Sequence, residues 1–127
     1  MGKVLGTEAF FTLYMPKNDA AEMLEELFRL ARYRFGSAVK SRWLHKADGC
    51  PGCGRDIDAV KLSKKKKALS LNTFIFREYG VLIAYMLCGN CASYIMESSK
   101  TNPNTLTSLH AEIEKNLKHE YLRHKGH

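Results

Sequence analysis

The sequence lacks a run of roughly 18 unbroken apolar residues, the length that a membrane-spanning helix needs. Its most apolar window, residues 74–96, is interrupted by charged residues, glycine and cysteine. The N-terminus lacks an apolar segment of signal-peptide length, and the early Glu8 is unlike a transit peptide. We therefore expect a cytoplasmic protein that does not enter a membrane.

Sequence motifs of common enzyme sites are missing as well. There is no phosphate-binding loop, no His-Glu-x-x-His zinc site and no Gly-x-Ser-x-Gly nucleophile elbow. Zinc deaminases need a His-x-Glu segment and a Pro-Cys-x-x-Cys segment, whereas here Cys50 precedes Pro51. We expect that the protein is not an enzyme.

The composition is that of a folded, basic chain. Of the 127 residues, 45% are apolar, which suffices for one modest core and predicts a single domain over residues 1–127. Twenty Lys and Arg against thirteen Asp and Glu give a net charge of +7. Such a charge favours encounter with a polyanion such as nucleic acid, although it also serves solubility.

Hydrophobic spacing predicts the elements that flank the centre of the chain. In the N-terminal part, residues 1–49, β-branched and aromatic residues predict a strand over residues 3–15, and apolar spacings of three and four predict a helix over residues 18–35. Residues 36–49 then form a connection, with Trp43 as its anchor. Residues 103–123 show the same helical spacing, and the apolar face of this second amphipathic helix comprises Leu106, Leu109, Ile113, Leu117 and Tyr121.

The four cysteines form the most informative pattern. They fall into two pairs, Cys50 with Cys53 and Cys88 with Cys91, and each pair has two intervening residues. This spacing lets a tight turn direct two sulfurs at one ion, and four thiolates suit the tetrahedral coordination of zinc. Because a catalytic zinc keeps a position open for water, four protein ligands predict a closed, structural ion.

Other chemistry can use the same residues. Two disulfides, a redox-active pair and an iron–sulfur cluster are the alternatives to zinc. The expected reducing compartment disfavours disulfides, and a thioredoxin-like site uses one pair and leaves the second without a role.

The segments Cys50-Pro51-Gly52-Cys53-Gly54 and Cys88-Gly89-Asn90-Cys91 resemble the zinc-ribbon family of small zinc-binding domains. The gap of 34 residues between Cys53 and Cys88 exceeds the usual gap of about 15 to 20. We expect this longer gap to hold strands at residues 56–62, 69–77 and 81–87, the last two joined by a turn at residues 78–80, so that the ribbon spans residues 50–98. The predicted fold is α+β: a small antiparallel sheet that includes the zinc ribbon, packed by the N-terminal and C-terminal amphipathic helices.

Basic residues cluster beside the first cysteine pair, and they comprise Arg55, Lys61, Lys64, Lys65, Lys66 and Lys67. A solvated loop is one interpretation of this lysine run. The other is a surface that binds phosphates, since zinc ribbons often bind nucleic acid in transcription and replication proteins. We therefore predict a structural zinc module that binds nucleic acid through this basic loop. A protein-binding adaptor, or a small inhibitor of a partner protein, is the alternative.

Overall fold

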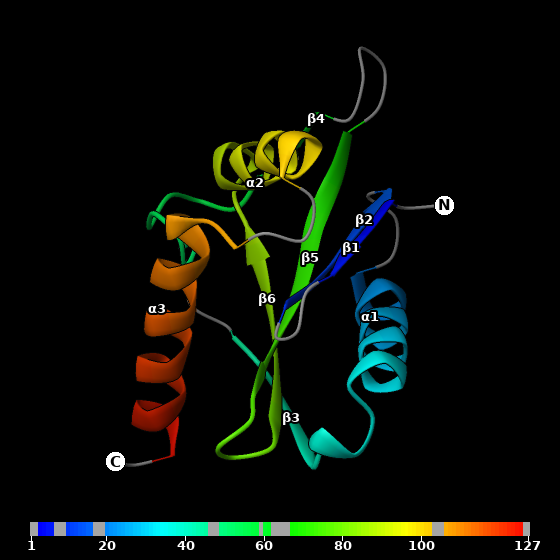
Figure 1. Ribbon diagram of the computed structural model, residues 1–127, viewed down its shortest axis with the longest axis vertical. Helices are drawn as coiled ribbons and strands as arrows, with labels where there is room; N and C mark the ends of the chain where they lie inside the picture. Colours follow the sequence, from blue (N-terminus) through cyan, green and yellow to red (C-terminus); the bar gives the residue numbers. More distant parts are fainter. Residues whose placement is uncertain are drawn as a thin grey trace.

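The computed structural model describes residues 3–6, 10–16, 20–45, 49–58, 60–61, 67–102 and 106–125, which form one layered arrangement (Figure 1). The elements in chain order are β1 (Lys3–Gly6), β2 (Phe10–Pro16), α1 (Ala20–Phe35), a 3-10 turn (Gly36–Ala38), β3 (Ser41–Leu44), β4 (Val60–Lys61), β5 (Lys67–Phe76), β6 (Val81–Leu87), α2 (Gly89–Thr101) and α3 (Ser108–His124). The predicted α+β class is confirmed.

The strands form a single mixed sheet in the order β1-β2-β5-β6-β3, and β4 pairs with the start of β5. All the paired strands of the described residues are antiparallel except β3, which runs parallel to β6. The expectation of a purely antiparallel sheet was therefore wrong.

The parallel strand follows from the path of α1. Strands β2 and β3 run in the same direction on opposite sides of the β5–β6 hairpin, and α1 connects them across one face of the sheet. Parallel strands need such a crossover connection. The predicted connection over residues 36–49 is therefore wrong at β3, a short edge strand on which Ser41 and Arg42 are exposed and show no apolar alternation.

The hairpin of β5 and β6 is buried on both faces, which explains its continuous apolar runs. Side chains of one face pack against α1, and this core comprises Met23, Leu27, Phe28, Ala31, Leu71, Ile75, Leu82 and Ala84. Alternate side chains of the same strands, among them Phe74 and Ile83, pack against α2 and α3 on the other face. The predicted turn at residues 78–80 is present, and Gly80 allows it by adopting a positive φ of 62°.

Several predicted boundaries differ from the structure. Residues 55–58 are irregular and only Val60–Lys61 pair in β4, so the expected strand over residues 56–62 is wrong over its described first half. The C-terminal helix begins at Ser108, which leaves Leu106 49% exposed and outside the core. Trp43 does serve as an anchor, since it is half-buried and its ring lies 5.4 Å from that of Tyr121. No helix among the described residues is long and apolar enough to cross a membrane.

Candidate metal centre

The first cysteine pair lies on a tight turn that follows from its sequence. The carbonyl oxygen of Cys50 accepts hydrogen bonds from the N–H groups of Cys53 at 3.3 Å and Gly54 at 2.8 Å. The Cys50 sulfur accepts a further bond from the N–H of Gly52 at 3.3 Å. Gly54 completes the turn at a φ of 82°, a conformation that glycine adopts without steric cost.

The second pair lies at the start of α2. Cys88 is the N-cap residue, and its sulfur accepts a hydrogen bond from the N–H of Cys91 in the first turn at 3.4 Å. The N-terminal end of a helix carries a partial positive charge, which favours thiolates. The resemblance implied a second turn at residues 88–91, whereas α2 already begins at Gly89, so the zinc-ribbon resemblance is not confirmed for the second pair.

The two pairs converge on one point. The four Sγ atoms all lie within 4.8 Å of one another, and those of Cys53 and Cys88 are 3.5 Å apart. A tetrahedral zinc with Zn–S bonds of about 2.3 Å needs sulfur–sulfur distances of about 3.8 Å. Shifts of about 1 Å or less therefore suffice for the cluster to close on an ion of this size.

Burial sets the acidity of the cluster. Cys50, Cys88 and Cys91 are buried and Cys53 is exposed. Burial raises the pKa values of the Cys88 and Cys91 thiols. Burial acts in the same direction on Cys53, but hydrogen bonds from the Arg55 backbone and from the neighbouring thiols outweigh it, and the pKa of Cys53 is lowered. Because a metal ion binds thiolates, loading the site releases protons and becomes weaker as the pH falls.

Neighbouring elements hold the first turn in place. The side-chain amide of Asn116 on α3 donates to the carbonyl oxygen of Pro51 at 2.7 Å. A Cβ atom at Gly52 would lie 3.1 Å from the Cys91 sulfur and 3.0 Å from Leu109 Cδ1, so only glycine fits there without displacement. The first pair is thus packed against both α2 and α3.

Cys53 opens onto a hollow of about 580 Å³ between the first turn, α2 and α3, lined by Cys53, Arg55, Asn90, Cys91, Tyr94, Ser108, Leu109 and Glu112. A metal site needs a path from solvent. This hollow reaches the one exposed sulfur of the cluster and supplies such a path.

The predicted phosphate-binding residues are placed only in part. Arg55 is exposed beside the first cysteine pair. The backbones of Lys61 and Lys67 lie opposite each other where β4 pairs with β5. Lys64, Lys65 and Lys66 lie outside the described residues.

Two features of the structure were not predicted from the sequence. The first is a basic groove between α1 and β3, which is lined by Arg29, Arg32, Lys40 and Arg42. His110 is buried and takes part in the N-terminal cap of α3, where its Nδ1 accepts a hydrogen bond from the N–H of Thr107 at 3.1 Å. The spacing of Thr107 and His110, three residues apart, was the available signal for this cap.

The sequence matches no family model, and comparisons with curated proteins and with solved structures find no match.

Proposed function

We propose that this protein is a non-catalytic zinc-binding module whose one zinc ion is held by Cys50, Cys53, Cys88 and Cys91. The observation that carries the proposal is the convergence of all four sulfurs within 4.8 Å, from two turns that are 35 residues apart in sequence at Cys53 and Cys88. A redox pair needs two cysteines, and nothing in its chemistry requires the other two to converge on the same point.

Zinc fits this donor set better than other common metals do. Four sulfur ligands select zinc or iron–sulfur chemistry, whereas calcium and magnesium prefer oxygen. With all four positions taken by protein, the zinc would be structural and would fix the first turn to the start of α2. The first turn keeps the zinc-ribbon pattern, whereas a helix replaces the second knuckle.

Metal analysis of protein purified without added metal, together with native mass spectrometry, tests this proposal. We expect one zinc per chain and loss of the folded state on chelation. A metal-free protein that is fully folded would overturn the proposal. Disulfides or a redox-active pair would then be the explanation for the four cysteines.

We further propose that the module binds nucleic acid. The support is the net charge of +7, the lysine run that includes Lys64, Lys65, Lys66 and Lys67, and the exposed Arg55 beside the zinc turn. Lysine–phosphate contacts provide affinity with little sequence preference and weaken steeply as salt rises.

Binding of labelled DNA and RNA at two salt concentrations tests this role. We expect binding at low salt that weakens as the salt concentration rises, and we expect the Lys64–Lys67 to Ala variant to bind less tightly. Absence of binding at low salt would reject nucleic acid as the partner. Unchanged affinity and salt dependence in the variant would reject the lysine run as the site.

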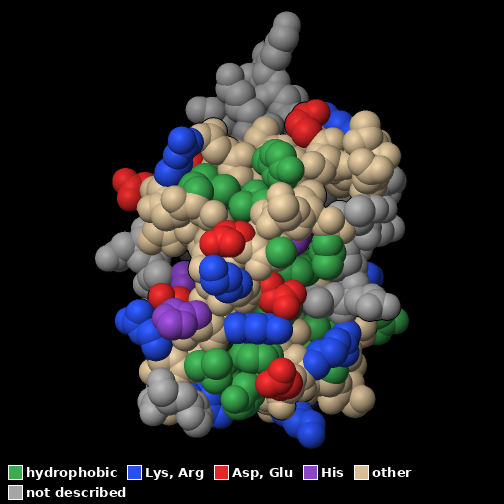
Figure 2. All heavy atoms as spheres, turned by 60° about the vertical axis from the view of Figure 1, so that its left-hand side comes forward, with side chains coloured by type: hydrophobic (Ala, Val, Ile, Leu, Met, Phe, Trp, Pro, Cys, Tyr) green, Lys and Arg blue, Asp and Glu red, His purple; other side chains and the backbone are tan. Residues whose placement is uncertain are grey.

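The adaptor alternative has less support. An adaptor that docks through an apolar face needs an exposed patch of several hundred Å². The large hydrophobic side chains exposed by the described residues are Tyr33, Tyr79, Tyr94 and Leu106. On the α3 side of the molecule, Figure 2 shows small hydrophobic patches separated by charged side chains of both signs.

A further inference from the structure

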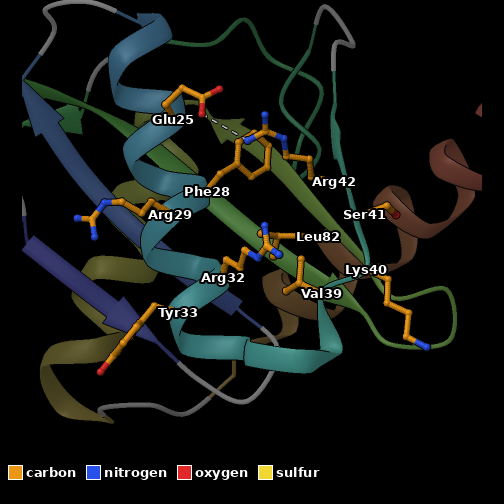
Figure 3. Close-up of a pocket in the computed structure, with 10 residues that line it drawn as sticks. All are labelled: Glu25, Phe28, Arg29, Arg32, Tyr33, Val39, Lys40, Ser41, Arg42 and Leu82. Atoms are coloured by element: carbon orange, nitrogen blue, oxygen red, sulfur yellow. Dashed lines mark hydrogen bonds and ion pairs between the residues drawn. The ribbon is translucent and has the colours of Figure 1, made fainter.

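A basic groove of about 700 Å³ lies between α1 and β3, on the face of the sheet opposite α2 and α3. Its floor is apolar and comprises Phe28, Val39 and Leu82. Figure 3 shows Arg32 of α1 and Arg42 of β3 pointing into the space between these elements.

The charges on the rim are predominantly positive. The lining contains the four cations Arg29, Arg32, Lys40 and Arg42 and a single carboxylate, that of Glu25. Within the described part of the chain, neither Arg32 nor Lys40 has a carboxylate partner, and both are exposed. These two cations are therefore available to an external anion.

The remaining cations are held only weakly by the protein. Arg42 approaches Glu25 at 3.5 Å, but both side chains are more than half exposed, so this ion pair contributes little. The Arg42 guanidinium carbon lies over the Phe28 ring, 4.7 Å from its centroid, which is a cation–π contact. Arg29 forms an exposed ion pair with Glu26 on its own helix.

An aromatic ring lies on the same helix as Arg29 and Arg32, and Figure 3 shows it extending from the side of α1 away from β3. Tyr33 is 90% exposed, whereas tyrosine is on average intermediate in burial. It stands one turn from Arg29 and directly after Arg32. An exposed ring beside arginines is the combination on which unpaired bases stack.

We infer that this groove binds single-stranded nucleic acid, with phosphates on Arg32, Lys40 and Arg42 and a base stacked on Tyr33. The inference rests on the proposed nucleic-acid function and assigns it a second surface. In Figure 3 the cationic groups spread from Arg29 across Arg32 to Lys40 and do not converge on one point. Such a spread suits a polyanionic strand better than a compact anion.

The groove is separate from Lys67, the residue of the lysine run whose backbone the structure describes. Lys67 lies at the start of β5, whereas Lys40 adjoins the turn that follows β5, where its N–H donates to the Gly80 carbonyl at 2.7 Å. The ten residues of β5 span about 30 Å at roughly 3.3 Å per residue. Arg32 and Lys40 can therefore be neutralised without altering the start of β5 or the cysteine cluster on the opposite face of the sheet.

The test measures fluorescence anisotropy of a labelled 12-nucleotide single strand with the zinc-loaded full chain, across a series of salt concentrations. The groove variant combines Arg32→Gln and Lys40→Gln. The matched control, Lys115→Gln with Arg123→Gln on α3, removes the same charge from exposed positions on the opposite layer. Zinc content and the thermal melt of each variant verify that it is folded.

We expect the groove variant to bind at least 10-fold more weakly at low salt, with the slope of log K against log salt reduced by about 1.4, since each lost phosphate contact accounts for about 0.7. The control should bind like the wild type. Tyr33→Ala should lose about 5-fold or more with an unchanged slope, and Tyr33→Phe should retain binding, because stacking needs the ring alone.

Each other outcome has a defined meaning. If the wild type does not bind at low salt, the proposed function fails and the groove inference fails with it. If the wild type binds and the groove variant matches the control, the proposed function stands and the groove inference is overturned. Equal affinity for a duplex, with no loss in Tyr33→Ala, would overturn the assignment to a single strand.

Discussion

The carboxylate of Asp58 accepts a hydrogen bond from the backbone N–H of Gly89 at 2.5 Å. Gly89 is the first residue of α2, and the first N–H groups of a helix have no partner within it. Asp58 thus joins the segment after the first cysteine pair to the helix that carries the second pair.

Substitution Asp58→Ala should lower the free energy of unfolding by about 1 kcal/mol, the usual cost of losing such a capping oxygen. Urea denaturation of the zinc-loaded protein measures the loss. Asp56→Ala is the control, because it removes an exposed carboxylate from the same segment and caps no helix in the described part of the chain. Equal losses in the two variants would show that the contact with Gly89 contributes nothing.

Substitution Cys53→Ser or Cys91→Ser should abolish stoichiometric zinc binding and unfold at least residues 50–98. Structural zinc contributes on the order of 10 kcal/mol in small peptides, which is comparable to the whole stability of a typical domain. Metal content and far-UV circular dichroism provide the measurement. The exposed Ser93 lies on α2 near the second pair, and Ser93→Ala should retain zinc and fold.

The glycines of the first turn should tolerate substitution unequally. A Cβ atom at Gly49 would lie 2.8 Å from the Gly54 carbonyl oxygen, and one at Gly52 would press on the Cys91 sulfur. Gly49→Ala and Gly52→Ala should each lower the free energy of unfolding of the zinc-loaded protein by about 1–3 kcal/mol, as overpacking does. Each should also lower the zinc affinity measured in competition with a chelator.

The control for these variants is Gly54→Asn. Gly54 has a positive φ and no atom within 4 Å of a Cβ built there, and asparagine tolerates this backbone conformation. A zinc affinity close to that of the wild type is expected. A loss as large as that of Gly52→Ala would contradict the steric explanation.

Acid should destabilise the fold partly through His110. Burial lowers the pKa of His110 below its ordinary value of about 6.5. The unfolded chain therefore binds a proton at His110 more readily than the folded protein does. The stability associated with the neutral ring is complete above pH 6.5 and is lost as the pH falls from there through the lower folded pKa.

His110→Gln isolates this effect, because glutamine can accept the Thr107 N–H bond but does not titrate. The free energy of unfolding should decrease less steeply below pH 6.5 in this variant than in the wild type. Loss of zinc on protonation of the cysteines occurs in both proteins. It therefore cancels when the pH dependence of the free energy of unfolding of the variant is subtracted from that of the wild type. The exposed His119 serves as the control: His119→Gln should retain the wild-type steepness.

Local patterns predicted the elements that depend on near neighbours. The cysteine spacing indicated two turns that each direct two sulfurs to one side, and the four sulfurs do lie together. The spacing of Met23, Leu27 and Ala31 predicted α1, and the apolar runs around residues 78–80 predicted the hairpin of β5 and β6. These features depend on the periodicity and turn preferences of a few consecutive residues, which the sequence displays directly.

Features that join distant segments were decided only by the tertiary structure. Strand β3 has few apolar residues, and it exists because α1 returns the chain beside β6, where backbone hydrogen bonding does not depend on side-chain type. The same crossover brings Arg32 of α1 next to Arg42 of β3 and so creates the basic groove. The sequence determined by itself which residues can hold a metal ion and which segments are helical or extended. Packing on the two faces of one sheet decided which of these segments lie next to each other, because their arrangement depends on contacts between residues far apart in the chain.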